Sequence, residues 1–361
     1  MDLYDAFDAP VPAVVLAEGE FGTTEGKTAN GVVMHSELFD VRAVVDSTRA
    51  GRSAADVLGR ESGDATGEAA DVPVVATTEE ALESAPDAEA LVIGVAPAGG
   101  ELPEEWVADI RRAMRAGCDV VSGLHTFLSE DCQWRDVADE FGVRLFDVRK
   151  PPEDDELRVA DGLVDDADAD VVLTTGTDCA VGKRTTTFEL YRAAKEAGLD
   201  AGWVATGQTG IMVGANRGVV VDRVPADFTA GVVEDLVCAV AEDHELVFVE
   251  GQAALSHRAY SGVTLSLLHG ANPDAVVLVD DPGRTERTDF DRFSVAGVER
   301  EVAAIEALAG GSDAPDDETV VAALSTWGDA DEQSAAWGLP AGNVYDEDGP
   351  ARLLDAVLDA L

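Results

Sequence analysis

The sequence contains few basic residues for its length. Lysine and arginine together number 25, against 72 aspartates and glutamates, and the formal net charge is −47. Such a chain repels polyanions, which argues against nucleic acid and anionic membrane surfaces as partners. The acidic residues are spread over the whole chain, and 46% of all residues are hydrophobic, so the composition favours a folded protein over a disordered one.

Cysteine pairs and long hydrophobic runs are also missing. The four cysteines are scattered without a Cys-x-x-Cys pair, which indicates neither a zinc site nor a disulfide framework. No stretch reaches the roughly 18 uncharged apolar residues that a membrane span needs. The acidic start, MDLYDAFDAP, lacks the basic and apolar regions of a signal peptide. We therefore expect a soluble cytoplasmic protein. As partners we expect a small-molecule amino acid substrate and further copies of the same chain in a homo-oligomer.

The charge imbalance itself predicts a halophilic protein, because molar salt shortens the Debye length to about 3 Å and screens the self-repulsion of the chain. Only four lysines are present: Lys27, Lys150, Lys183 and Lys195. Two of them lie in glycine-rich contexts, "TTEGKTANG" and "AVGKRTTT". A lysine kept in a tight turn of such a chain is a candidate for a function, although Lys27 could equally cap a helix.

Short β-branched runs alternate with amphipathic segments along the chain. This alternation predicts an α/β fold with mainly parallel, doubly wound sheets. A length of 361 residues favours two domains, and the polar, proline-containing segment at 149–170 is the best boundary. We predict a Rossmann-like domain at 1–150 and a second α/β domain at 151–361.

The second domain opens with "VVLTTGTDCAVGKRTTT" at 171–187. A strand, a glycine-containing turn and a helix in this order are typical of a P-loop, whose backbone N–H groups and lysine bind phosphate. Five residues separate the two glycines, and an arginine stands where a Mg²⁺-binding hydroxyl is usual. These departures weaken the argument for magnesium. The predicted cofactor-binding residues are Gly176, Thr177, Asp178, Gly182, Lys183, Arg184, Thr185 and Thr186.

Three downstream residues are candidates for catalysis. Glu250 ends the strand-like run "LVFVEG", and Gln252 follows it. His257 lies in the next loop, where α/β active sites open, and is the first choice for a general base. Glu250 and Asp222 are the candidate metal ligands if the enzyme depends on magnesium. A solvent-facing carboxylate and a structural loop histidine are the alternatives for Glu250 and His257.

Several motifs together resemble one family. "EGKTANGVV", "GTDCAVGKRTTT", "TGQTGIM", "ADFTAGVVE" and "VEGQAALSHRAYSGVTLSLLHG" are similar to a bacterial and archaeal family of long unknown function, some of whose members are described as D-glutamate N-acetyltransferases. "GTDxxVGK" and "VEG" also resemble dethiobiotin synthetase, a P-loop enzyme. The segment from "VPVVATTEEALESA" to "AGCDVVSG" resembles the CoA-binding domain of succinyl-CoA synthetases.

These resemblances imply two mechanisms for one loop. The first is transfer of an acetyl group from acetyl-CoA to an acidic amino acid, with D-glutamate as the expected acceptor and the P-loop holding the cofactor phosphates. The resemblance places this activity in D-amino acid metabolism. In this mechanism Glu250 or His257 acts as the base, and backbone N–H groups or Gln252 donate to the oxyanion. The alternative is an ATP- and magnesium-dependent ligase or kinase of the dethiobiotin synthetase type.

Overall fold

The computed structural model describes residues 3–59, 72–97, 100, 102–288, 290–309 and 319–361. The chain divides into two compact units, Met1–Lys150 with Gln208–Gly214, and Pro151–Gly207 with Ala215–Leu361. Residues 208–214 therefore belong to the first unit although they lie inside the range predicted for the second domain. That 1–150 and 151–361 are separate domains stays a prediction.

The first unit contains a six-stranded parallel sheet with the order β3-β2-β1-β4-β5-β6. This is the strand order of a Rossmann fold. The strands are β1 (Val11–Leu16), β2 (Phe39–Val45), β3 (Val74–Val75), β4 (Ala90–Ile93), β5 (Asp119–Ser122) and β6 (Leu145–Asp147). The helices are α1 (Lys27–His35), α2 (Ala54–Leu58), α3 (Thr78–Ser84), α4 (Val107–Arg115), α5 (Cys132–Phe141) and α7 (Gln208–Val213).

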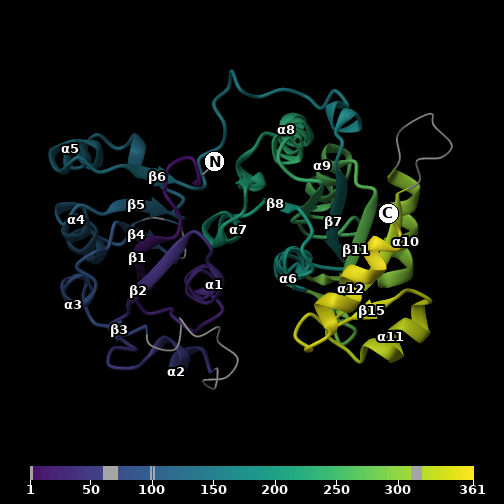
Figure 1. Cartoon of the computed structure of the whole chain (residues 1–361), viewed down its shortest axis with the longest axis horizontal. Helices are drawn as coiled ribbons and strands as arrows, with labels where there is room; N and C mark the ends of the chain where they lie inside the picture. The colour runs from purple at the N-terminus through teal and green to yellow at the C-terminus, as the bar shows by residue number, and fades with distance from the viewer. Residues whose placement is uncertain (1–2, 60–71, 98–99, 101, 289, 310–318) are drawn as a thin grey trace. The chain divides into compact units, whose positions relative to one another are not determined.

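Helices cover both faces of this sheet. Figure 1 shows α3, α4 and α5 side by side on one face and α1 on the other. The strand β4 is buried along its whole length, and β1 is buried except at the partly exposed Pro12, which explains why both strands are apolar. Lys27 is the first residue of α1, and Gly26 before it makes no side-chain cap.

The second unit contains a seven-stranded parallel sheet with the order β15-β14-β11-β7-β10-β8-β9. Its strands are β7 (Asp170–Gly176), β8 (Ala201–Ala205), β9 (Arg217–Gly218), β10 (Leu246–Val249), β11 (Ala275–Asp280), β14 (Val320–Thr326) and β15 (Ala341–Gly342). Its helices are α6 (Lys183–Glu196), α8 (Thr229–Ala241), α9 (Ser261–Ala271), α10 (Val298–Leu308), α11 (Ala330–Trp337) and α12 (Gly349–Leu358). A small hairpin, β12 (Glu286–Arg287) and β13 (Phe290–Ser294), follows β11.

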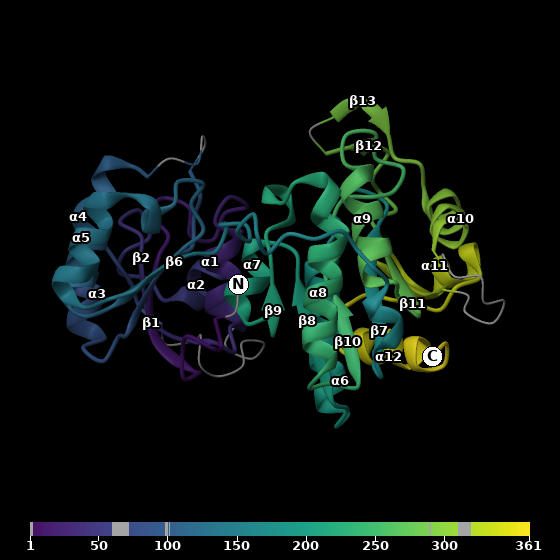
Figure 2. The ribbon, with the colours of Figure 1, turned by 90° about the horizontal axis from the view of Figure 1, so that it is seen from above.

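The sheet of the second unit separates two helical layers. Helices α8, α9 and α10 share one apolar core with the strands, while α6 and α12 pack on the other face (Figure 2). The strands β7 and β10 are neighbours, and all seven strands run the same way, so their carboxyl ends meet at one edge. The predicted α/β class, with one Rossmann-like and one P-loop-like part, is confirmed. Among the described residues, no helix is both long and apolar enough to cross a bilayer.

Candidate functional site

The predicted P-loop is the turn between β7 and α6. Gly176 ends the strand, and a Cβ there would lie 2.8 Å from the Val181 side chain, so only glycine fits. Gly182 has a φ of +103° and Ala180 one of +52°, which fold the loop back on itself. Such a turn forms a concave nest of backbone N–H groups. The first-turn amides of α6 add to it, because they have no acceptor within the helix.

The carbonyl oxygens of the loop are held by side chains around it. Arg287 donates to the Thr177 oxygen at 3.0 Å, and Arg284 donates to the Cys179 oxygen at 2.6 Å. The indole nitrogen of Trp327 donates to the Val181 oxygen at 2.6 Å. With these carbonyls engaged, the loop is fixed in a shape whose remaining polar groups are donors, which suits an anion.

Lys183 and Glu250 form a buried pair of titratable groups beside the loop. Lys183 is 7% exposed, and burial lowers its pKa to about 8. Its ammonium donates to the Asp178 carbonyl at 2.6 Å. Glu250 is 4% exposed, and burial raises its pKa to about 7 against the opposing effects of Arg184 and nearby backbone N–H groups. Burial thus brings the titration of this carboxyl closer to neutral pH than that of an exposed glutamate.

Gln252 lies in the same hydrogen-bonded group as Glu250. Its Nε2 donates to the Thr206 hydroxyl at 2.9 Å, and that hydroxyl donates to the Glu250 carbonyl at 2.7 Å. The Thr206 N–H donates to the Glu250 carboxylate at 3.1 Å. A Cβ at Gly251 would lie 1.6 Å from the Thr174 carbonyl, so the chain after β10 passes directly against β7. This close approach brings Glu250 and Gln252 to the P-loop.

Asp178 anchors the other side of the loop. Its carboxylate is fully buried and accepts from Arg287 at 3.1 Å and from the Thr288 N–H at 3.0 Å. Burial alone raises the pKa of Asp178, but the N–H groups of Thr288 and Cys179 and the Arg287 guanidinium outweigh it and hold the pKa below its usual value. Arg287 also donates to the Ser256 hydroxyl at 2.7 Å. The β12–β13 hairpin thereby attaches to the loop.

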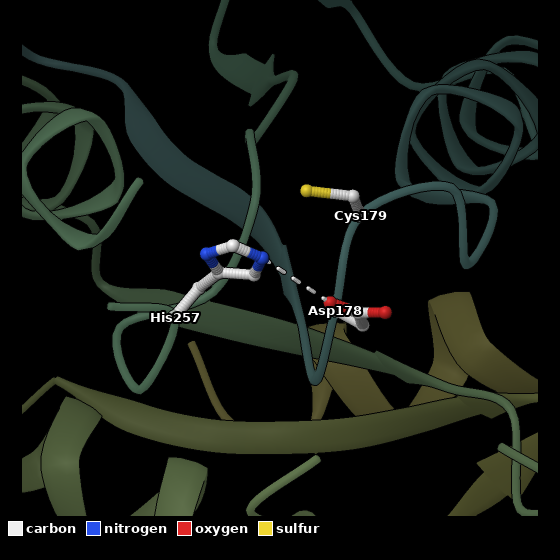
Figure 3. A group of neighbouring side chains, drawn as sticks. All are labelled: Asp178, Cys179 and His257. Carbon is white, nitrogen blue, oxygen red and sulfur yellow. Dashed lines mark ion pairs between the residues drawn. The ribbon is translucent and has the colours of Figure 1, made fainter. Parts of the chain in front are cut away.

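His257 is enclosed in this part of the site. Its Nε2 lies 3.7 Å from Asp178 Oδ1 and has no hydrogen-bond partner among the described residues (Figure 3). Its Nδ1 accepts from the Ala259 N–H at 3.2 Å, so in a neutral ring Nε2 carries the proton. The ring stacks on Tyr260 and meets the edge of Phe290. Burial, followed by the Arg287 charge, lowers the pKa of His257. Its role as general base stays a prediction.

A metal site can be sought in the same cluster. Among the described residues, the group of three that could hold an ion is Asp178, Cys179 and His257, whose ligand atoms lie within 4.8 Å of one another. The protonated Nε2 and the Arg287-paired carboxylate offer poor ligand atoms, however. Asp222, one of the two predicted ligands, lies exposed in a 3-10 helix, Val221–Arg223. Neither Asp222 nor Glu250 belongs to the group.

The remaining predicted binding residues divide into two kinds. The hydroxyls of Thr177 and Thr186 form hydrogen bonds within the fold. That of Thr177 donates to the Asp280 carboxylate at 2.6 Å, and that of Thr186 is hydrogen-bonded to the Ser325 hydroxyl at 2.9 Å. Arg184 and Thr185 are half-buried, and no described side chain or carbonyl is hydrogen-bonded to their side chains. These two therefore remain available at the start of α6, next to Lys183.

Sequence reasoning missed three residues that shape the loop. Arg284, Arg287 and Trp327 reach it from segments more than 100 positions downstream. The available signal was the two arginines of "GRTER" directly after a buried strand in a chain poor in basic residues.

Comparison with known proteins places these features in a family. Residues 158–354 match the P-loop domain DUF1611_C, and residues 55–151 match the Rossmann-like domain DUF1611_N, both described as domains of unknown function. A crystal structure of a DUF1611 family protein from Anabaena variabilis is 32% identical, with a TM-score of 0.84 over 97% of this chain and 99% of that one. The two-part α/β protein described here therefore belongs to the DUF1611 family, as its motifs predicted.

Two curated relatives carry the name of an activity. A D-glutamate N-acetyltransferase from Tritonibacter scottomollicae is 37% identical over 292 residues, which are 78% of this chain and 85% of the relative. A second protein of that name, from a Pseudoalteromonas species, is 37% identical over 212 residues, 59% of this chain and 62% of the relative.

Proposed function

We propose that this protein is an N-acetyltransferase that transfers the acetyl group of acetyl-CoA to the amino group of D-glutamate. The names of its two curated relatives support the reaction and the acceptor. The observation that carries the proposal is the buried Glu250 carboxyl, with a pKa of about 7, beside the cationic P-loop. A base with this pKa is matched to proton transfer near neutral pH.

The P-loop would bind the cofactor through its phosphates. The first-turn amides of α6, the Lys183 ammonium and the Arg184 guanidinium all belong to the start of this helix and would hold a diphosphate. No phosphate bond is broken in this reaction, so the loop serves to position the cofactor. The Thr186 hydroxyl already binds Ser325, which fits a site that does not depend on magnesium.

The chemical step follows from the groups beside the loop. Once the ammonium group of D-glutamate has lost one proton to solvent, the amino nitrogen would form a bond to the thioester carbonyl carbon, and the Glu250 carboxylate would accept the second proton of this nitrogen. An N–H of Gln252 would stabilise the tetrahedral oxyanion. The oxyanion would then collapse with breakage of the carbon–sulfur bond, and the CoA thiolate would leave and take up the proton held by Glu250. The P-loop and the Glu250 carboxylate lie at one edge of the sheet, so the pantetheine arm of a cofactor held by the loop would have to fold back along this edge to reach Glu250.

The test is an acetyl-transfer assay in molar KCl, as the charge of −47 suggests. Release of CoA thiol is measured with acetyl-CoA and D-glutamate in the presence of EDTA. We expect release that depends on D-glutamate and is unaffected by the chelator. Lys183→Met should raise the KM for acetyl-CoA, whereas Lys195→Met, near the far end of α6, should not. Absence of D-glutamate-dependent release in the unmodified protein contradicts the proposal.

One observation favours the alternative, an ATP- and magnesium-dependent ligase or kinase. Glu250 directly follows β10, the neighbour of the P-loop strand, and acts electrostatically on Lys183. A carboxylate at this position is suited to hold magnesium beside a triphosphate. The same assay separates the two activities: product formation that requires ATP and Mg²⁺ and proceeds without acetyl-CoA favours the ligase or kinase.

A further inference from the structure

Two large aromatic side chains lie exposed in the second unit. Trp327 is 51% exposed and Tyr345 is 57% exposed. Their ring centroids are 5.3 Å apart, with an angle of 57° between the ring planes. Exposed aromatic rings in contact with one another are a surface suited to a flat ligand. Only 6% of the residues of this chain are aromatic, which makes the pair conspicuous.

Trp327 is fixed directly against the P-loop. Its indole N–H donates to the Val181 carbonyl at 2.6 Å, and its backbone N–H donates to the Asp280 carbonyl at 3.2 Å. A Cβ at Gly182 would lie 3.4 Å from the indole nitrogen, so the edge of the ring borders the loop. The edge is thus anchored to the loop while half of the side-chain surface stays exposed.

The two rings follow neighbouring strands at the edge of the sheet that carries the loop. Trp327 comes directly after β14, and Tyr345 comes after β15, which pairs with β14 in parallel. The P-loop follows β7 of the same parallel sheet, so all three segments lie at its carboxyl edge. The two rings are therefore candidates to contact a planar group of a ligand whose diphosphate lies in the loop.

We propose that Trp327 and Tyr345 form a subsite that stacks the adenine ring of an adenosine 5′-diphosphate moiety whose phosphates occupy the P-loop. The proposal rests on the proposed function in so far as the loop binds phosphate, and it extends that function to the base of the ligand. Adenine is uncharged at neutral pH, so stacking recruits it without opposition from the acidic surface. CoA and ATP both contain this moiety, and the test includes both sources.

The experiment compares affinities for parts of the ligand. Isothermal titration calorimetry in molar KCl measures the affinity of the full chain for ADP, CoA, inorganic pyrophosphate and 4′-phosphopantetheine. The variants are Trp327→Leu, Trp327→Phe and Tyr345→Leu. Trp337→Leu is the matched control, because Trp337 is 41% exposed and its indole binds Gln333 within α11. Trp327→Phe keeps a ring but loses the bond to Val181, which separates stacking from anchoring.

We expect Trp327→Leu and Tyr345→Leu each to lower the affinity for ADP and for CoA by about tenfold, in line with base–aromatic stacking. The affinities for pyrophosphate and 4′-phosphopantetheine should change by less than about twofold in Tyr345→Leu, since these ligands lack the adenine base. Trp327→Phe should retain most of the affinity for ADP, and Trp337→Leu all of it. Thermal melting of each variant identifies unfolded protein, and Tyr345→Leu provides the decisive comparison if Trp327→Leu does not fold.

Equal weakening of ADP and pyrophosphate in Tyr345→Leu, or unchanged ADP affinity in that variant, overturns the subsite. Its failure is distinguishable from failure of the proposed function. If ADP binding depends on both rings but acetyl-CoA gives no product with D-glutamate, the result supports the adenine subsite and contradicts acetyl transfer. If acetyl transfer proceeds with an unchanged KM for acetyl-CoA in Tyr345→Leu, the result supports acetyl transfer and contradicts the adenine subsite.

Discussion

Two buried carboxylates act on the same lysine, Lys183, and their surroundings differ. Asp178 accepts from a guanidinium and from backbone N–H groups, and its pKa lies below the usual value. Glu250 is equally inaccessible, but burial outweighs the groups that favour its charge, and its pKa rises to about 7. The pKa of one carboxylate is shifted away from neutral pH, and that of the other is shifted towards it.

This difference assigns the two residues different tasks. The Asp178 carboxylate accepts a hydrogen bond from Arg287, and Arg287 in turn donates to the Thr177 carbonyl. The charge of Asp178 therefore maintains the shape of the loop. A buried charge with many partners has little capacity to exchange a proton. Glu250 has fewer compensating partners, which destabilises its ionised form and leaves it able to accept a proton. The predictions below test this division, from the largest expected effect to the smallest.

The largest effect should come from Glu250→Gln. Removing a general base lowers turnover by about 10² to 10⁴. The variant keeps the shape of the side chain, so the Kd for acetyl-CoA should change little. Steady-state kinetics together with titration of the cofactor separates the two quantities. A loss of binding that accounts for the whole loss of activity would place Glu250 among the binding groups instead.

Asp178→Asn should act on stability. The change leaves the Arg287 guanidinium buried without its counter-charge, and breaking such a pair costs about 3–5 kcal/mol. Denaturant unfolding in molar KCl measures the free energy. Asp227→Asn, an exposed aspartate in the 3-10 helix Ala226–Phe228, serves as the control and should stay within about 0.5 kcal/mol of the unmodified protein. A fully stable Asp178→Asn variant argues against an anchoring role.

The raised pKa of Glu250 also predicts how the free energy of unfolding changes with pH. Its pKa is about 7 in the folded chain, against an ordinary value of 4.5. Between these values the unfolded chain has lost the proton and the folded chain keeps it, so this group lowers stability as pH rises through that window. Glu250→Gln lacks the penalty, and its stability relative to the unmodified protein should rise by about 3 kcal/mol from pH 4.5 to above pH 7. A constant difference across the window refutes the raised pKa.

The fold and the loop were predictable from local patterns, and the supports of the loop were not. The run "VVLTTG", the two glycines and Lys183 specify strand, nest and helix start within 15 positions of one another. Glu250 was predictable because a polar residue that ends a buried strand must lie at the carboxyl edge of the sheet. Arg284, Arg287 and Trp327 bind loop carbonyls from distant segments, and no local periodicity encodes such contacts. Burial, which sets the pKa of Glu250, is likewise a property of the assembled sheet.

The smallest effect should come from His257, and it discriminates between the two bases that the sequence suggested. The Nδ1 of His257 is occupied by the Ala259 N–H, and Nε2 carries the proton, so the neutral ring has no open lone pair. His257→Gln should therefore lower kcat by less than about tenfold, short of the factor that a general base supplies. The pH profile of kcat/KM gives the decisive reading. The ionisation near pH 7 should persist in His257→Gln and vanish in Glu250→Gln, because the pKa of Glu250 lies at about 7, whereas that of His257 is lowered from its ordinary value. Persistence in Glu250→Gln and loss in His257→Gln would exchange the roles of the two residues.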